Sequence, residues 1–405
     1  MAPLGTPRQD HLVEADRHRE PSNPAECAPQ ARTLGIYLHI PFCRRRCHYC
    51  SFNTGPYDPT AMERFLIALE REIDLVGAAP WAPTVRVGTL FFGGGTPSLL
   101  EAEELARILN RVRKQFVLDE DAEITVECNP ESVSRDKLEG YRLAGVNRVS
   151  LGVQSLDDAL LRRLGRLHSA AEAHRAIEDA RAAGIWNVNV DLIYGFPGLD
   201  LLTWERSVRG ALAWEPEHLS AYALTLDEGS RRASQGVRDL PTEDAVTEQY
   251  WSLATSAREA GYTHYEISNY CRSGFRSRHN QAYWRREEYL GLGPGACGFL
   301  GEVRYGNVKP VERYCWRLET GAFPVGQADQ LSPEQQLGEQ LILGLRLEEG
   351  VPVPWLEARV AERPARLRQL LDSWQALKLL VVEAGRARLT EAGFLLSDAL
   401  FVEFL

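Results

Sequence analysis

The sequence predicts an α/β fold: a partial (β/α)6 barrel of the TIM type, followed by a small α+β domain. From Gly35 to about Asn269, short β-like runs alternate with helical patterns at intervals of about thirty residues, which is typical of parallel β/α units. After residue 330 the pattern changes to helices, then a strand, a turn and a second strand. Six β/α units favour an incomplete (β/α)8 barrel over an open sheet.

Each expected strand is a short β-like run, and four of the six alternate polar and apolar residues. The six runs are Ile36–Ile40, Val87–Phe92, Glu123–Cys128, Arg148–Val153, Asn187–Ile193 and Leu219–Leu224. Helices are expected between them, for example at Thr60–Val76 and Glu101–Gln115. One face of the third strand carries Glu123, Thr125 and Glu127, while its other face is apolar. We therefore expect polar faces to line a lumen, with solvated edges of an open sheet as the alternative.

Four regions are expected along the chain. Residues 1–34 are expected to form a disordered tail, residues 35–269 the barrel, residues 270–330 an extension that packs on it, and residues 331–405 a winged-helix-like domain. The extension is rich in aromatic residues and glycine and is expected to end in a linker, Gly321–Gln330. The last domain is expected to begin a helix after Ser332 and to form a strand pair around Gly385. Since the protein is acidic, we interpret this domain as a lid or interaction module rather than a DNA-binding one.

Composition excludes some classes of function. The 405 residues carry a net charge of -10, which argues against a general binder of nucleic acid or of anionic membranes. The sequence contains no apolar run of about 18 residues, so no transmembrane helix is expected. The start of the chain lacks the apolar stretch of a secretory signal. With eight cysteines, three of them clustered, a reducing, cytoplasmic location is expected.

Three cysteines follow the first expected strand. Cys43, Cys47 and Cys50 have the spacing C-x3-C-x2-C, and no fourth cysteine follows closely. Thiolates hold the irons of iron-sulfur clusters, and three thiolates leave one iron of a four-iron cube open to a small chelating molecule. A zinc site with His48 or His39 as fourth ligand is an alternative. A disulfide is less favoured, because three clustered thiols cannot all pair.

The cysteine motif, preceded by YLHIPF, resembles the radical S-adenosylmethionine (SAM) superfamily, and within it the anaerobic coproporphyrinogen III oxidase-like (HemN/HemW) family. The resemblance implies a 4Fe-4S cluster whose open iron chelates SAM. The glycine-rich FFGGGTP segment resembles the family's GGE-type motif, which contacts SAM. The positions that the resemblance assigns to SAM are Tyr37, Tyr49, Gly94, Gly95, Thr96, Glu127, Gln154, Arg166 and Asp191. Whether a second SAM binds stays open.

A second motif, HNxxYW, lies in the extension. It consists of His279, Asn280, Tyr283 and Trp284, and it is similar to a motif associated with heme binding in the heme chaperones of this family. By residue type alone, a packed histidine among aromatic residues is the favoured interpretation. The following GLGPGACG departs from the family pattern, because Cys297 stands where relatives usually have histidine. A cysteine thiolate can serve as an axial heme ligand.

The resemblance favours a heme chaperone over an enzyme. Oxidases of the HemN type carry a further cysteine two residues after the third, where this chain has Phe52. Oxygen-independent coproporphyrinogen III oxidase is the alternative, followed by a radical methyltransferase and by a non-catalytic protein whose cysteines hold a structural metal. The absence of that cysteine after Cys50 argues against coproporphyrinogen oxidase activity, and whether the protein is an enzyme stays open.

Two kinds of protein partner are expected. A heme chaperone needs a heme-accepting protein. Arg44, Arg45 and Arg46 lie between the first two cysteines and are expected to attract an acidic electron donor such as a flavodoxin or ferredoxin, unless they are simply an exposed charged loop. The sequence leaves a homodimer open.

Overall fold

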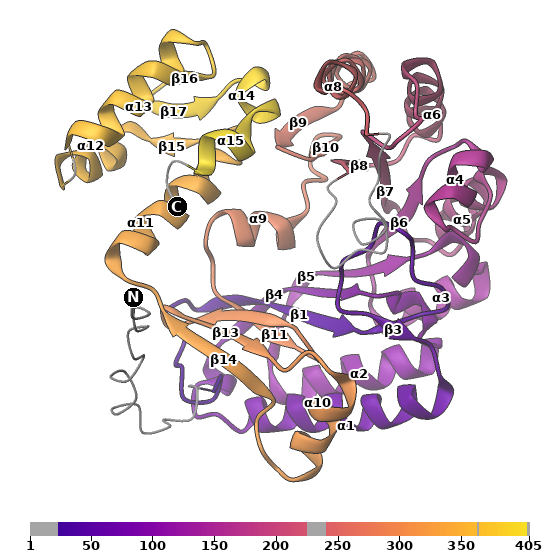
Figure 1. Ribbon diagram of the computed structural model, residues 1–405. Helices are drawn as coiled ribbons and strands as arrows, with labels where there is room; N and C mark the ends of the chain where they lie inside the picture. The colour runs from indigo at the N-terminus through magenta and orange to yellow at the C-terminus, as the bar shows by residue number, and fades with distance from the viewer. Residues whose placement is uncertain (1–22, 225–239, 363, 403–405) are drawn as a thin grey trace, which may run out of the picture.

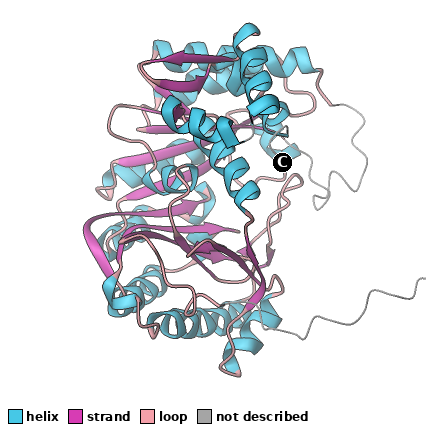
Figure 2. Ribbon diagram, turned by 90° about the vertical axis from the view of Figure 1, so that its left-hand side faces the viewer, coloured by secondary structure: helices cyan, strands magenta, loops and turns pink. Residues whose placement is uncertain are grey.

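One curved sheet organises most of the chain. The structure is a computed structural model that describes residues 23–224, 240–362 and 364–402. Within these residues twelve strands join in the order β14-β13-β12-β11-β1-β4-β5-β6-β7-β8-β10-β9. The sheet curls around helix α9 (Arg278–Trp284), and the helices of the β/α units cover its outer face (Figures 1 and 2).

Six parallel strands form the middle of the sheet, as the sequence predicts. They are β1 (Thr33–Ile40), β4 (Arg86–Gly94), β5 (Val117–Cys128), β6 (Arg148–Gln154), β7 (Asn187–Tyr194) and β8 (His218–Ala223). The helices that follow them are α1 (Pro59–Gly77), α2 (Ala102–Gln115), α3 (Arg135–Ala144), α4 (Asp158–Leu164), α5 (Ala170–Ala182), α6 (Leu201–Ala213) and α8 (Glu243–Glu259). The predicted α/β fold with six β/α units is therefore confirmed.

The extension is part of the same sheet. Its strand β11 (Tyr289–Leu292) pairs in parallel with β1, and β12 (Cys297–Leu300), β13 (Val303–Asn307) and β14 (Val325–Gln330) continue from it antiparallel. On the opposite edge, β10 (Asn269–Cys271) pairs with β8 and with β9 (Thr263–Glu266). The prediction of a linker at Gly321–Gln330 is wrong, because this segment contains strand β14. The boundary expected after Asn269 falls inside β10. Both corrections follow from pairing, which covers strand edges that would otherwise expose unpaired backbone groups.

A buried carboxylate joins the extension to α1. Glu72 accepts hydrogen bonds from the Gly293 N–H at 2.8 Å and from the Tyr314 hydroxyl, on α10 (Val311–Glu319), at 2.5 Å. It also accepts one from the Asn307 amide at 2.6 Å. Burial raises the pKa of Glu72 to about 7. These bonds fix the Gly293 turn, which packs against the backbone of His39 just before the cysteine loop.

The C-terminal domain has its own core and lies beside β9 and α8 (Figure 1). Its elements are α11 (Pro333–Leu345), β15 (Val351–Pro352), α12 (Val353–Glu362), α13 (Pro364–Ala376), β16 (Leu380–Glu383), β17 (Arg386–Leu389), α14 (Glu391–Leu395) and α15 (Ser397–Phe401). Ser332 caps α11 in a capping box, and Gly385 turns between β16 and β17, as predicted. Strand β15 and helix α12 were not predicted from the sequence. The Tyr250 hydroxyl donates to the Glu391 carbonyl at 2.9 Å across the contact with the barrel.

The tail expected at residues 1–34 needs a correction. Residues 1–22 lie outside the described residues. Of the remainder, Cys27 and Leu34 are buried in the main hydrophobic core, and β1 already begins at Thr33. The Ala31 N–H also donates to the Glu288 carboxylate. Residues 23–34 therefore pack against the barrel.

Candidate functional site

A polar cavity of about 380 Å³ lies at the carboxyl ends of the parallel strands. The three cysteines of the motif line it, as do eight of the nine residues assigned to SAM. Tyr37 is the exception: its hydroxyl lies 3.0 Å from His39 Nδ1. The polar faces of β5, β6, β7 and β8 thus meet in one lumen, as the alternation in the sequence predicts. Residues that the sequence analysis did not assign also line it, namely Asn129, Arg148, Ser150, Asn189, Ser220 and Tyr222.

The cysteine loop forms one wall of the cavity. Two short strands, β2 (Phe42–Cys43) and β3 (Gly55–Pro56), pair in parallel at its ends. Cys43 is buried, and burial raises the pKa of its thiol. Its sulfur accepts a hydrogen bond from the Thr96 hydroxyl at 3.4 Å. Cys47 and Cys50 are half-buried.

Arg166 links the cysteine loop to the barrel. Its guanidinium donates to the Cys47 sulfur at 3.5 Å, to the Gly152 carbonyl at 2.6 Å and to the Asn129 side chain at 2.7 Å. A hydrogen bond from a cation stabilises a thiolate and orients it. Three thiols on one wall, with hydrogen-bond donors at Cys43 and Cys47, fit a cluster held by three thiolates. Arg166 therefore contacts this loop as well as the cavity.

The glycine turn holds the cysteine loop in place. The Gly95 N–H donates to the Ile40 carbonyl and the Thr96 N–H to the Phe42 carbonyl, both at 2.8 Å. A Cβ atom on Gly95 would lie 2.5 Å from the Phe42 carbonyl oxygen. The resemblance assigns this turn to contact with SAM. In the structure its amides bind the neighbouring loop, and glycine is needed for that close approach.

Two carboxyl groups face the cavity. Burial, and then the charge of Asp191, raise the pKa of Glu127 to about 8, although one oxygen accepts a hydrogen bond from the Gly94 N–H at 3.1 Å. Burial also raises the pKa of Asp191, which accepts hydrogen bonds from Asn189 at 2.6 Å and Ser150 at 3.3 Å. At neutral pH Glu127 is largely protonated, so it can donate a hydrogen bond to a bound ligand as well as accept one.

The HNxxYW motif forms α9, and its histidine is fully hydrogen-bonded. His279 Nδ1 lies 2.8 Å from the Thr89 hydroxyl, and Nε2 lies 2.9 Å from the Tyr283 hydroxyl. The ring stacks on Phe91 with centroids 5.1 Å apart. Burial, with the charge of Arg148, lowers the pKa of His279 to about 3. His279 is therefore a neutral packed histidine in this structure, which is the interpretation that residue type alone favours.

The other residues of the motif have different surroundings. Asn280 lines the cavity, and the Arg346 guanidinium lies over the Trp284 ring at 4.2 Å. Cys297 is exposed and does not line the cavity. The structure thus places Asn280 of the motif at the cavity and keeps Trp284 and Cys297 away from its lining.

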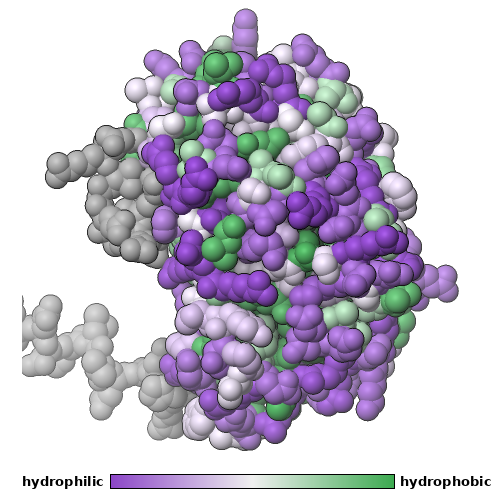
Figure 3. Space-filling view, turned by 90° about the vertical axis from the view of Figure 1, so that its right-hand side faces the viewer, coloured by the Kyte–Doolittle hydropathy of each residue, from purple (hydrophilic) through white to green (hydrophobic). Residues whose placement is uncertain are grey.

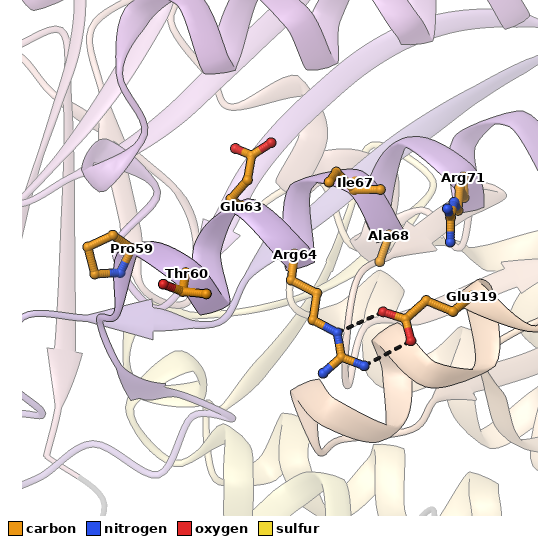
Figure 4. Close-up of a pocket in the computed structure, with 8 residues that line it drawn as sticks. All are labelled: Pro59, Thr60, Glu63, Arg64, Ile67, Ala68, Arg71 and Glu319. Carbon is orange, nitrogen blue, oxygen red and sulfur yellow. Dashed lines mark hydrogen bonds and ion pairs between the residues drawn. The ribbon is translucent and has the colours of Figure 1, made fainter.

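The outer surface carries a second cavity, away from the motif residues. A cavity of about 650 Å³ lies between α1 and α10, where Arg64 and Glu319 form a double hydrogen bond (Figure 4). None of the motif residues lines it. The face that carries α4 and α5 is mostly hydrophilic, with hydrophobic residues in small separate groups (Figure 3). In the part of the chain that the structure describes, no helix has the length and apolarity needed to span a membrane.

The chain is similar to proteins of known families along most of its length. Residues 37–209 match the family model of the radical SAM superfamily, and residues 331–396 match that of the HemN C-terminal domain. The chain is 41% identical over 374 residues to a Mycobacterium tuberculosis protein named heme chaperone HemW, covering 90% of this chain and 93% of that protein. It is 34% identical over 378 residues to the Bacillus subtilis protein of the same name, covering 91% and 98%.

One solved structure has the same fold. The Escherichia coli coproporphyrinogen III oxidase (HemN), described as a radical SAM enzyme, aligns with a TM-score of 0.83. The two sequences are 24% identical, and the alignment covers 94% of this chain and 92% of that one. This match shows the fold of both domains.

Replacing Gly95 by alanine is expected to displace the cysteine loop, because the new methyl group would overlap the Phe42 carbonyl. After anaerobic reconstitution, Gly95→Ala is expected to hold several-fold less iron and sulfide per chain than the wild type. Gly55→Ala is the matched control, since the atom nearest to its Cβ would be 3.9 Å away. Equal iron content in the two variants would contradict the role assigned to the glycine turn.

Proposed function

The chain belongs to the radical SAM superfamily, within the coproporphyrinogen III oxidase-like (HemN/HemW) family, and from this premise we propose that it is a heme chaperone. Membership of the superfamily implies a 4Fe-4S cluster and SAM. The proposal is that the protein binds both, binds heme as well, and delivers the heme to an acceptor protein in a reducing, cytoplasmic compartment. All eight cysteines are free thiols, which suits that setting.

One observation carries the choice of chaperone over oxidase. Phe52 lines the mouth of the cavity with 62% of its surface exposed, at the position where HemN-type oxidases are expected to carry a further cysteine. The relatives named heme chaperone HemW support the same choice, because they match this chain over nearly their full length.

The residues present can hold the implied cofactors. Cys43, Cys47 and Cys50 would bind three irons of the cluster, with Thr96 and Arg166 donating to two of the sulfurs. The cavity beneath them offers Glu127, Gln154 and Asp191 to SAM. When bound, the cluster supplies an electron to SAM. Tyr37 does not line the cavity. Its hydroxyl contacts His39, so its proposed effect on SAM binding is indirect.

The heme contact is proposed at α9 and its surroundings. The side chains of His279 and Tyr283 are hydrogen-bonded to each other. Glu123 accepts hydrogen bonds from the Arg278 and His279 N–H groups at 3.0 Å each. These bonds orient the helix that presents Asn280 to the cavity. The role proposed for His279 and Tyr283 is therefore to shape this surface, since neither nitrogen of the imidazole is free to bind iron.

Titration of the purified chain with hemin tests the function. We expect about one heme per chain, detected by its Soret absorption. The double variant His279→Ala, Tyr283→Ala is expected to bind heme about tenfold more weakly or worse, because α9 loses its supporting bonds. Trp186→Ala is the control, since Trp186 is exposed and distant in sequence from the motif.

Three results would change this account. Failure of the wild type to bind hemin would remove the chaperone proposal. Wild-type affinity in the double variant would remove the site but not the function. Formation of protoporphyrinogen on anaerobic incubation with coproporphyrinogen III, SAM and a reductant would favour the oxidase instead.

An acidic electron donor is proposed to dock beside the cysteines. Arg44, Arg45 and Arg46 are exposed there, and Arg45 also lines the cavity mouth. Replacing all three by Glu is expected to slow reduction of the cluster by a flavodoxin severalfold at low salt and much less at high salt, because screening weakens steering. Reversal of Arg206 and Arg209 on α6 is the control. An unchanged rate in the triple variant would refute this docking site.

A further inference from the structure

Arg148 is a buried cation on the inner face of the barrel. It begins β6, its surface is 2% exposed, and it lines the polar cavity. Among the described residues its side chain forms no hydrogen bond or ion pair, and its buried Nε atom has no partner. A buried charge is normally paired, because transfer from water without a partner costs several kcal/mol. The position therefore calls for an anion.

The neighbouring carboxylates are already bound to other groups. Both oxygens of Glu123 accept hydrogen bonds from the start of α9, and Asp191 accepts them from Asn189 and Ser150. Glu127 accepts one from Gly94. Because the pKa of Glu127 is raised to about 8, it carries little charge at neutral pH. Arg148 thus acts electrostatically on Glu127 and Asp191, but in the part of the chain that the structure describes neither of them forms an ion pair with it.

The positive field of Arg148 extends over the floor of the cavity. Burial, and then the charge of Arg148, lower the pKa values of His218 and His279, so both stay neutral. The His218 nitrogens lie 2.6 Å from Asn189 Oδ1 and 2.7 Å from the Tyr265 hydroxyl. The Arg148 guanidinium therefore has no hydrogen-bonded counter-ion, although its charge acts on the Glu127 and Asp191 carboxyl groups. Neutral polar side chains of the same lining surround it, namely Ser150, Asn189, Ser220 and Asn280.

We propose that Arg148 is the centre of an anion subsite on the cavity floor, which binds a carboxylate of the ligand. A guanidinium pairs with a carboxylate through two parallel N–H···O bonds, and the neighbouring hydroxyl and amide groups complete its hydrogen bonding. The inference rests on the proposed function, which puts two carboxylate-bearing molecules at this cavity. The carboxylate comes either from the amino-acid part of SAM or from a propionate of heme.

The test compares each ligand with a form that lacks the carboxylate. The full chain, reconstituted with its cluster, is titrated with SAM, decarboxylated SAM, hemin and hemin dimethyl ester. In Arg148→Met the preference for the carboxylate form of one ligand is expected to shrink tenfold or more, the size of one lost charge-assisted contact. Arg148→Lys is expected to keep part of it. Arg286→Met is the matched control, since Arg286 is buried in ion pairs with Glu302 and Glu339 outside the cavity.

The outcomes separate the two sources and the two proposals. A loss confined to the SAM pair identifies the SAM carboxylate, and a loss confined to the hemin pair identifies a propionate. Wild-type preferences for both ligands in Arg148→Met, or equal weakening of all four probes, would overturn the subsite. If Arg148→Met does not fold, Arg148→Gln takes its place. A shrunken preference for the carboxylate form of one ligand in Arg148→Gln supports the subsite, and unchanged preferences for both ligands overturn it. Failure of the wild type to bind hemin refutes the chaperone proposal, while the SAM pair still tests Arg148.

Discussion

The structure depends on the contact between the cysteine loop and the glycine turn. Strands β1 and β4 are parallel neighbours, so the loops that leave their carboxyl ends meet. Two backbone hydrogen bonds, from Gly95 and Thr96 to the Ile40 and Phe42 carbonyls, join them. Because a side chain on Gly95 would enter this contact, the glycine is a requirement of the loop's position. This contact between the two loops places the three thiols on the wall of the cavity.

Polar side chains inside the barrel surround the cavity of about 380 Å³. Most inward-facing polar side chains are hydrogen-bonded to each other or to α9, which enters the sheet from the extension. The apolar faces of the same strands form the main core with the outer helices. Such a lumen differs from a closed barrel filled with branched apolar residues, and its polar side chains can bind a ligand that carries charged or hydrogen-bonding groups. The raised pKa of Glu127 and the unpaired Arg148 are both consequences of that buried polar setting.

The sequence predicted the parts of the fold that depend on local patterns. The six parallel strands and the start of α11 were found because alternation and capping residues are local signals. The pairing of β11 with β1, across the whole barrel sequence, has no such signal and was missed. Arg148 was also missed as a site residue, although it lies in phase with Ser150, Gly152 and Gln154 on the inner face. The hydrogen bonds of His279 depend on Thr89 and Tyr283 together, and only the fold brings Thr89 near.

Individual replacement of Cys43, Cys47 and Cys50 by alanine tests the central claim most directly. Each variant is reconstituted with iron and sulfide without oxygen, and its visible and electron paramagnetic resonance spectra are recorded with and without SAM. The account predicts that the wild type gains a brown chromophore whose spectrum changes on addition of SAM, and that each variant loses both properties. A variant that keeps the chromophore together with its response to SAM would contradict a cluster held by these three thiolates above the polar cavity.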